Sequence, residues 1–165
     1  MAPDAIEVWD WFIDAFKEKD FLDIPSIIVY YFAHIPWHPD IAYHGKRISE
    51  ATKEHVRKRF DEFDKKDVEK LLGFIDEENR IARGSLGQSV EALVSSLSKR
   101  DILLLEIIQD RRLAIFLREN AALIYAYHHP KEALPLLRAL SKEGSWYAGE
   151  LFSFIGEHGW INPYA

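Results

Sequence analysis

LLLEIIQDRRLAIFLRENAALIYAY, residues 103–127, reads as two apolar helices joined by a short polar turn. Related phrases lie on either side of it: LLGFIDEENRIARGSLGQSVEALV at residues 71–94 and ALPLLRALSKEGSWYAGELFSFIGEHG at residues 133–159. When the copies are aligned on their paired leucines at 71/72, 104/105 and 136/137, they are 33 and 32 residues apart. A period of this length is typical of stacked helical hairpins, in which each unit buries its apolar face against the next.

The part of the chain before these phrases also predicts helices. A helix is expected from about residue 3 to residue 19, because five apolar side chains fall on one of its faces: Ile6, Trp9, Phe12, Ile13 and Phe16. Residues 25–35 have a strand-like composition, but without a second strand to pair with they are predicted as a buried helix ended by Pro36. Ser49 is expected to cap a helix that runs to about Phe63.

These helices predict a single all-α domain over residues 1–165. Residues 1–66 would form an N-terminal helical cap, and residues 67–165 would form three antiparallel hairpins stacked as a short superhelix. The alternative is an irregular antiparallel helix bundle in which the repeat period is accidental.

Residues typical of helix caps and turns indicate where the predicted hairpins begin and end. Asp67 is expected to cap the first and Asp101 to open the second, while Pro130 is expected at the helix start of the third. Gly144 should end the first helix of that third hairpin, and Ser145 should open the last helix.

The hairpin phrases resemble HEAT-type or armadillo-type helical repeats over residues 67–159. In that family a turn aspartate and a second-helix arginine tend to pair along the stack. The matching residues are Asp76 and Arg83 in the first hairpin, and Asp110 followed by Arg118-Glu119-Asn120-Ala121-Ala122 in the second. The third hairpin carries Ala133-Leu134-Pro135 and Ile155-Gly156, but Ser141 and Ala148 near the pairing positions. The ladder of pairs is therefore expected to stop there.

The resemblance implies non-enzymatic binding of another protein. HEAT-like iron hydroxylases use His-Glu pairs, whereas this chain has only the reversed order at Glu54-His55 and Glu157-His158. HEAT-like DNA glycosylases grip DNA with a basic face, and the net charge of −6 with no basic stripe argues against nucleic acid as a partner.

The composition of the chain excludes further classes of protein and of functional site. A chain of 165 residues with 48% hydrophobic content can fold around one core, and the absence of cysteine excludes disulfides, thiol catalysis and cysteine-based metal sites. The acidic N-terminus does not resemble a signal peptide, and no apolar run reaches the length of a membrane span. A cytoplasmic protein without a membrane partner is expected.

The first predicted helix carries a candidate recognition surface. Trp11 lies opposite the apolar stripe on the helical wheel, and acidic residues flank it: Asp4, Glu7, Asp14 and Glu18. A tryptophan in such a setting suits an interface anchor, and the surrounding charge favours a basic protein partner. The competing interpretation is that another segment, such as residues 160–164, covers this side chain. An inhibitor or immunity-type protein that masks a basic target is one version of this function. The concave face lined by the second helices of the hairpins is the other predicted binding surface.

The second candidate site is a histidine-rich stretch, residues 34–44, that extends into the irregular segment predicted at residues 36–47. Four ligand-type side chains lie within eleven residues there: His34, His38, Asp40 and His44. Imidazole and carboxylate ligands suit a divalent metal ion such as zinc, nickel or non-haem iron. The alternative function is therefore a metal-dependent hydrolase or oxygenase, with Asp40 as a ligand or general base. An ordinary packed loop is the competing interpretation.

Overall fold

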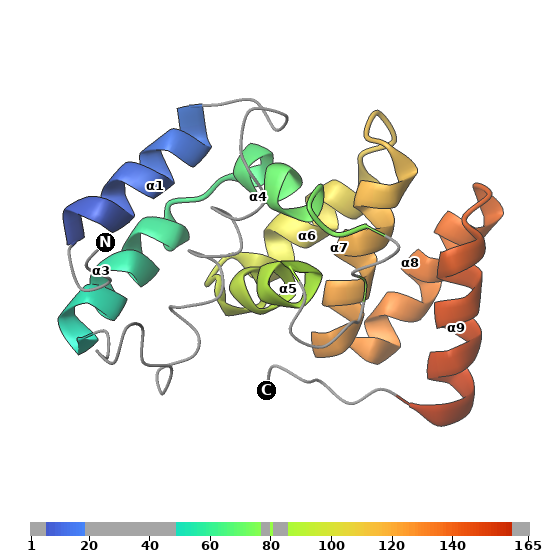
Figure 1. Ribbon diagram of the computed structural model, residues 1–165. Coiled ribbons are helices and arrows are strands. Elements are labelled where there is room, and N and C mark those ends of the chain that lie inside the picture. Colours follow the sequence, from blue (N-terminus) through green and yellow to red (C-terminus); the bar gives the residue numbers. More distant parts are fainter. Residues whose placement is uncertain (1–5, 19–48, 77–79, 81–85, 160–165) are drawn as a thin grey trace. The chain divides into compact units, whose positions relative to one another are not determined.

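A computed structural model describes residues 6–18, 49–76, 80 and 86–159. Every regular element among these residues is a helix, as the sequence predicts (Figure 1). The chain divides into two compact units, residues 1–98 and residues 99–165, called here the first and second units. None of the described helices is long and apolar enough to cross a membrane.

The first unit contains α1 (Ile6–Glu18), α3 (Glu50–Asp61), α4 (Lys65–Leu72) and α5 (Leu86–Ser96). Within this unit α1 packs on α3, and α4 packs on α5. The predicted division placed the α4–α5 segment with the later helices, whereas the contacts of the chain group it with α1 and α3.

The apolar stripe of α1 lies in the core of the first unit. Trp9, Phe12, Ile13 and Phe16 are all buried, as their helical spacing predicts. Phe16 stacks on Phe63 with ring centroids 5.5 Å apart, and Phe60 meets the same ring edge-on at 5.4 Å. Such aromatic pairs add about 0.5–1.5 kcal/mol each beyond the apolar area that they bury.

Two lysines fasten the end of α1 to α4. The Lys70 ammonium donates to the backbone oxygens of Phe16 and Lys17 at 3.0 and 3.1 Å, where carbonyls at the helix C-terminus lack intrahelical partners. The Lys17 ammonium in turn donates to Asp67 at 2.8 Å. Positive charge at a helix C-terminus also complements the helix dipole.

The starts of α3 and α4 show which cap predictions hold. Ser49 is the N-cap of α3, and its side chain accepts from the Thr52 N–H at 3.2 Å, as predicted. The prediction that Asp67 caps the next helix was wrong, because Asp64 is the N-cap. Asp67 closes a capping box by accepting from the Asp64 N–H at 3.1 Å.

The second unit consists of α6 (Arg100–Gln109), α7 (Ile115–His128), α8 (Pro130–Lys142) and α9 (Trp146–His158). α6 packs on α7, α8 packs on α9, and α7 also contacts both α8 and α9. Figure 1 shows these four helices following one another in yellow, orange and red.

α7 is the central helix of the second unit. All ten residues from position 118 to position 127 are buried, so this helix has no solvent-facing stripe over that length. A helix enclosed in this way must be apolar or have satisfied polar groups on every side.

The ends of α8 follow the predicted signals. Pro130 occupies the first turn, Gly144 adopts φ +106° after the last turn, and Ser145 caps α9 by accepting from the Ala148 N–H at 3.0 Å. The positive φ explains why glycine suits this position. The predicted helix at residues 25–35 lies outside the described residues.

We expect Lys70→Met to lower the free energy of unfolding by about 1–2 kcal/mol, because it removes the charged donor from two α1 carbonyls. Urea denaturation followed by circular dichroism measures this change. Lys58→Met is the matched control, since Lys58 is 75% exposed and lies 3.9 Å from Glu54 in a surface ion pair. Equal effects of the two substitutions would contradict the assigned role of Lys70.

Candidate functional site

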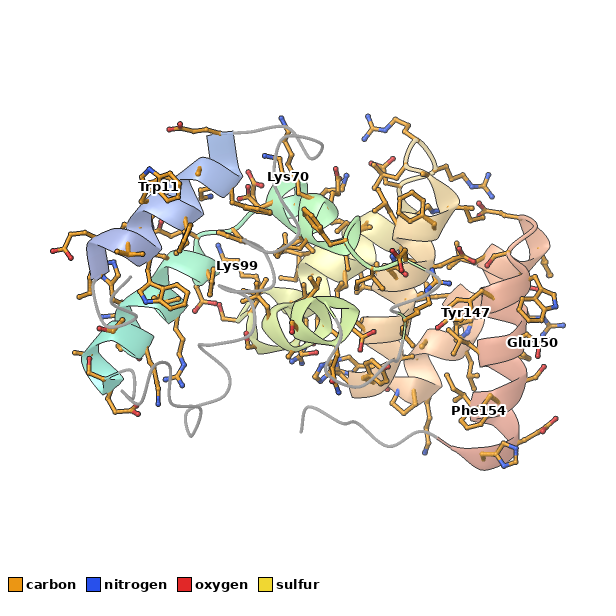
Figure 2. The ribbon with its side chains drawn as sticks, viewed as in Figure 1. Trp11, Lys70, Lys99, Tyr147, Glu150 and Phe154 are labelled. Atoms are coloured by element: carbon orange, nitrogen blue, oxygen red, sulfur yellow. The ribbon has the colours of Figure 1, made fainter. Side chains whose placement is uncertain are left out.

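The solvent-facing side of α1 presents a tryptophan in an acidic setting (Figure 2). Trp11 is 62% exposed, and Glu7, Asp14 and Glu18 are also exposed. These four residues are spaced by four, three and four positions, which places them along one face of the helix. α1 as a whole carries four acidic residues and one basic residue.

Ion pairs with α3 hold this helix face in position. Arg59 donates to Asp10 at 2.6 Å and to Asp14 at 2.5 Å, and the His55 ring lies 2.8 Å from the same Asp10 carboxylate. Burial opposes ionisation of Asp10, but the hydrogen bonds from His55 and Arg59 outweigh it, so the pKa of Asp10 lies below its ordinary value.

This pairing divides the acidic residues of α1 into two groups. Asp10 and the predicted surface residue Asp14 share the charge of Arg59. Glu7 and Glu18 are the exposed carboxylates farther along the stripe on either side of Trp11. Sequence reasoning missed Asp10, Arg59 and His55, because a helical wheel does not show which neighbouring helix faces it.

Two sets of predicted site residues lie outside the described residues. Asp4 precedes the described part of α1, and the predicted metal ligands His34, His38, Asp40 and His44 all fall between positions 19 and 48. The metal-site hypothesis therefore stays a prediction. Among the described residues, no group of three or more histidine and acidic side chains is arranged to hold a metal ion.

α9 carries further exposed aromatic side chains. Trp146 is 76% exposed and Phe154 is 48% exposed. The buried stripe of α9 is formed instead by smaller side chains: Ala148, Leu151 and Ile155. Figure 2 shows Tyr147 and Phe154 on this helix together with Glu150.

A buried arginine connects three elements of the second unit. The Arg118 side chain, only 6% exposed, donates from Nε to the Ile108 carbonyl oxygen at 2.8 Å. Its Nη1 donates to Glu143 at 2.6 Å, and Arg111 approaches the same carboxylate at 3.3 Å. The hydrogen bond from Arg118 lowers the pKa of Glu143, and its attraction adds to this effect.

A second polar contact fastens α7 to the turn between α8 and α9. The Ser145 hydroxyl donates to the buried Glu119 carboxylate at 2.5 Å while its oxygen caps α9. Arg118 and Glu119, adjacent on α7, thus hold Glu143 and Ser145, two residues apart in the turn.

This arrangement differs from the pairing that the family resemblance implies. Asp110 accepts from Arg112 at 2.9 Å, and the carboxylate bound by Arg118 comes from the following turn. In the third hairpin Ser141 lies near the position of the turn aspartates, so the ladder of pairs was expected to end there. Glu143, two residues later, instead supplies the carboxylate that pairs with Arg118.

Two consecutive histidines, His128 and His129, lie where α7 ends and α8 begins. The His129 ring lies 2.8 Å from the Asp101 carboxylate and 4.9 Å from the Tyr125 ring centroid. Burial lowers the pKa of His128 to about 4, and the nearby positive charge of Arg100 acts in the same direction. His128 is therefore neutral at physiological pH.

We expect Glu143→Ala to lower the free energy of unfolding by about 2–3 kcal/mol, because it leaves the buried Arg118 guanidinium without its anionic partner. Chemical denaturation measures the loss. Glu106→Ala on the exposed side of α6 is the control and should change the value by less than about 0.5 kcal/mol. Equal stability of the two variants would show that the contact contributes little.

We expect His128 to make stability fall as the pH is lowered from 6.5 to about 4. Its pKa in the folded state lies below the unfolded value, so the unfolded chain binds the proton first and is favoured by acid. In His128→Gln this dependence should shrink by about 2 kcal/mol across the window. Thermal unfolding at several pH values measures it. His158→Gln, which alters an exposed histidine, should keep the dependence of the natural protein.

Comparison of the chain with models of known protein families, with curated proteins and with solved structures found no match. Its function is therefore inferred from the geometry and charge of its own residues.

Proposed function

We propose that this protein is a non-enzymatic binding module that engages a basic protein partner through the exposed face of α1. The observation that carries the proposal is the 62% exposure of Trp11 between the exposed acidic residues Glu7 and Glu18. An exposed indole costs solvation free energy in the free protein and contributes strongly when a partner covers it.

The way in which α1 is held in place supports its role as a binding surface. The opposite side of α1 is buried, and Arg59 and His55 of α3 hold Asp10, one residue before the indole. Trp11 itself contacts the Phe12 ring edge-on at 5.2 Å. A helix held in a fixed position loses little backbone entropy on binding, which increases the affinity that its anchor's buried area can supply.

Charge supports a basic partner in particular. The helix carries a net charge of −3, and Arg59 pairs with only two of its four carboxylates, those of Asp10 and Asp14. Lysine or arginine side chains of a partner would find exposed carboxylates on both sides of the indole, and arginine could also stack on it. An inhibitor that masks a basic surface remains our proposal for the biological role.

The predicted alternative surface, formed by the second helices of the hairpins, receives less support. α7 is the second helix of one such hairpin, and its residues 118–127 are buried. The Arg118–Glu143 contact joins α7 to the turn after α8 and so contributes to a rigid scaffold. Under this proposal the scaffold has a structural role, and recognition occurs on α1.

We expect Trp11→Ala combined with Glu7→Lys to abolish capture of a stoichiometric partner from a lysate of the source organism. The identified partner should then bind the purified natural protein with an affinity that decreases as salt is raised, since exposed charges contribute. The fold should be retained, because both side chains are exposed.

Trp146→Ala is the matched control, because Trp146 is a tryptophan on α9 of the second unit that is even more exposed than Trp11. It should leave partner capture and affinity unchanged. Loss of the partner in Trp146→Ala, with retention in the α1 variant, would place the interface on α9 and overturn the proposal.

A further inference from the structure

We propose that a pocket in the second unit binds a ligand that combines a carboxylate with a small apolar body. This site would act in addition to the α1 surface and does not depend on it. The pocket lies where the end of α6, the first turns of α7 and the last turns of α8 meet. Its volume is about 180 Å³. For scale, an apolar cavity of about 150 Å³ can hold benzene.

The walls of the pocket are of two kinds. Ile108, Leu136 and Leu140 supply apolar surface, and Arg111, Arg118 and Glu143 supply the charged groups. Aliphatic surface excludes water from a small ligand and strengthens any charge interaction beside it. A ligand that fits should therefore have an apolar part as well as a charged part.

The charged groups leave the pocket with an excess of positive charge. Two guanidinium groups, those of Arg111 and Arg118, share the single carboxylate of Glu143. The contacts of Arg118 are short at 2.6 and 2.8 Å, and its side chain is 94% buried, so it is fixed by the fold. The remaining positive charge favours an anionic ligand.

Arg111 is the residue positioned to receive that anion. Its side chain is 78% exposed, and its contact with Glu143 is long at 3.3 Å. It can therefore turn toward a ligand without leaving a buried charge unpaired. The planar guanidinium binds a carboxylate through two parallel hydrogen bonds, a geometry that a lysine or an amide cannot reproduce.

A carboxylate with an apolar body exists both as a free carboxylic acid and as the C-terminus of a peptide that ends in an apolar residue. The two share the chemistry that the pocket would recognise. Both are anionic, whereas the partner proposed for α1 is basic, so the two sites call for ligands of opposite charge.

Benzoate is the probe that tests the pocket, because its ring matches the volume and its carboxylate matches the charge. Titration of the full chain by NMR should show saturable binding of benzoate that is about tenfold tighter than that of benzyl alcohol, which has the same ring without the charge. Benzylammonium should bind more weakly than either.

Variants test whether the binding site is this pocket. Arg111→Gln should weaken benzoate binding about tenfold, and Leu136→Trp should abolish it by filling the space. Arg112→Gln is the matched control: Arg112 is a neighbouring exposed arginine that pairs with Asp110 and does not line the pocket. It should leave the affinity unchanged, and circular dichroism should show that all three variants fold.

A short peptide ending in phenylalanine distinguishes the two ligand sources. If the free-acid peptide binds more tightly than benzoate while its C-terminal amide does not bind, the ligand is a peptide terminus. If benzoate binds more tightly than the peptide, the ligand is a free acid. The proposal is overturned if benzoate binds no better than benzyl alcohol, or if Arg112→Gln weakens binding as much as Arg111→Gln.

Discussion

The guanidinium of Arg118 is the group on which the second unit depends. It is buried, so its charge would be costly without partners, and it is satisfied by the Ile108 carbonyl and the Glu143 carboxylate. These partners belong to the end of α6 and to the turn after α8, so one side chain of α7 fixes both neighbours. Glu119 does the same for Ser145, which also caps α9. The enclosure of α7 is possible because its polar groups have partners on adjacent elements.

In the first unit, lysine side chains hydrogen-bond the polar groups at helix ends. Lys70 satisfies carbonyls at the end of α1, and Lys17 reaches Asp67 in the capping box of α4. Both ammonium groups also lie over phenylalanine rings, Lys17 at 4.9 Å from Phe63 and Lys70 at 5.5 Å from Phe16. Because these contacts fix one side and the end of α1, the opposite side with Trp11 is presented to solvent in a defined orientation.

The ion pairs that support the fold also decide which charged side chains remain available to bind a partner or ligand. On α1, Arg59 pairs with Asp10 and Asp14, so the carboxylates of Glu7 and Glu18 on either side of Trp11 keep most of the available negative charge. In the second unit the unpaired charge is positive, since Arg111 and Arg118 share the single carboxylate of Glu143 beside the apolar walls of the pocket. The two proposed sites therefore differ in charge for the same reason: each is the remainder of an ion-pair network that supports the fold.

The sequence by itself determined the helical class, the buried stripe of α1, the Ser49 and Ser145 caps and the breaks at Pro130 and Gly144. These features depend on local spacing and backbone preference, which neighbours along the chain specify. It also placed Trp11 opposite the buried stripe. Only the tertiary structure decided that α9 leaves Trp146 exposed, that Glu143 rather than a turn aspartate pairs with Arg118, and that Asp10 meets Arg59 across 49 residues. Such contacts join residues distant in the chain, and which side chains meet depends on how the helices pack rather than on any local pattern.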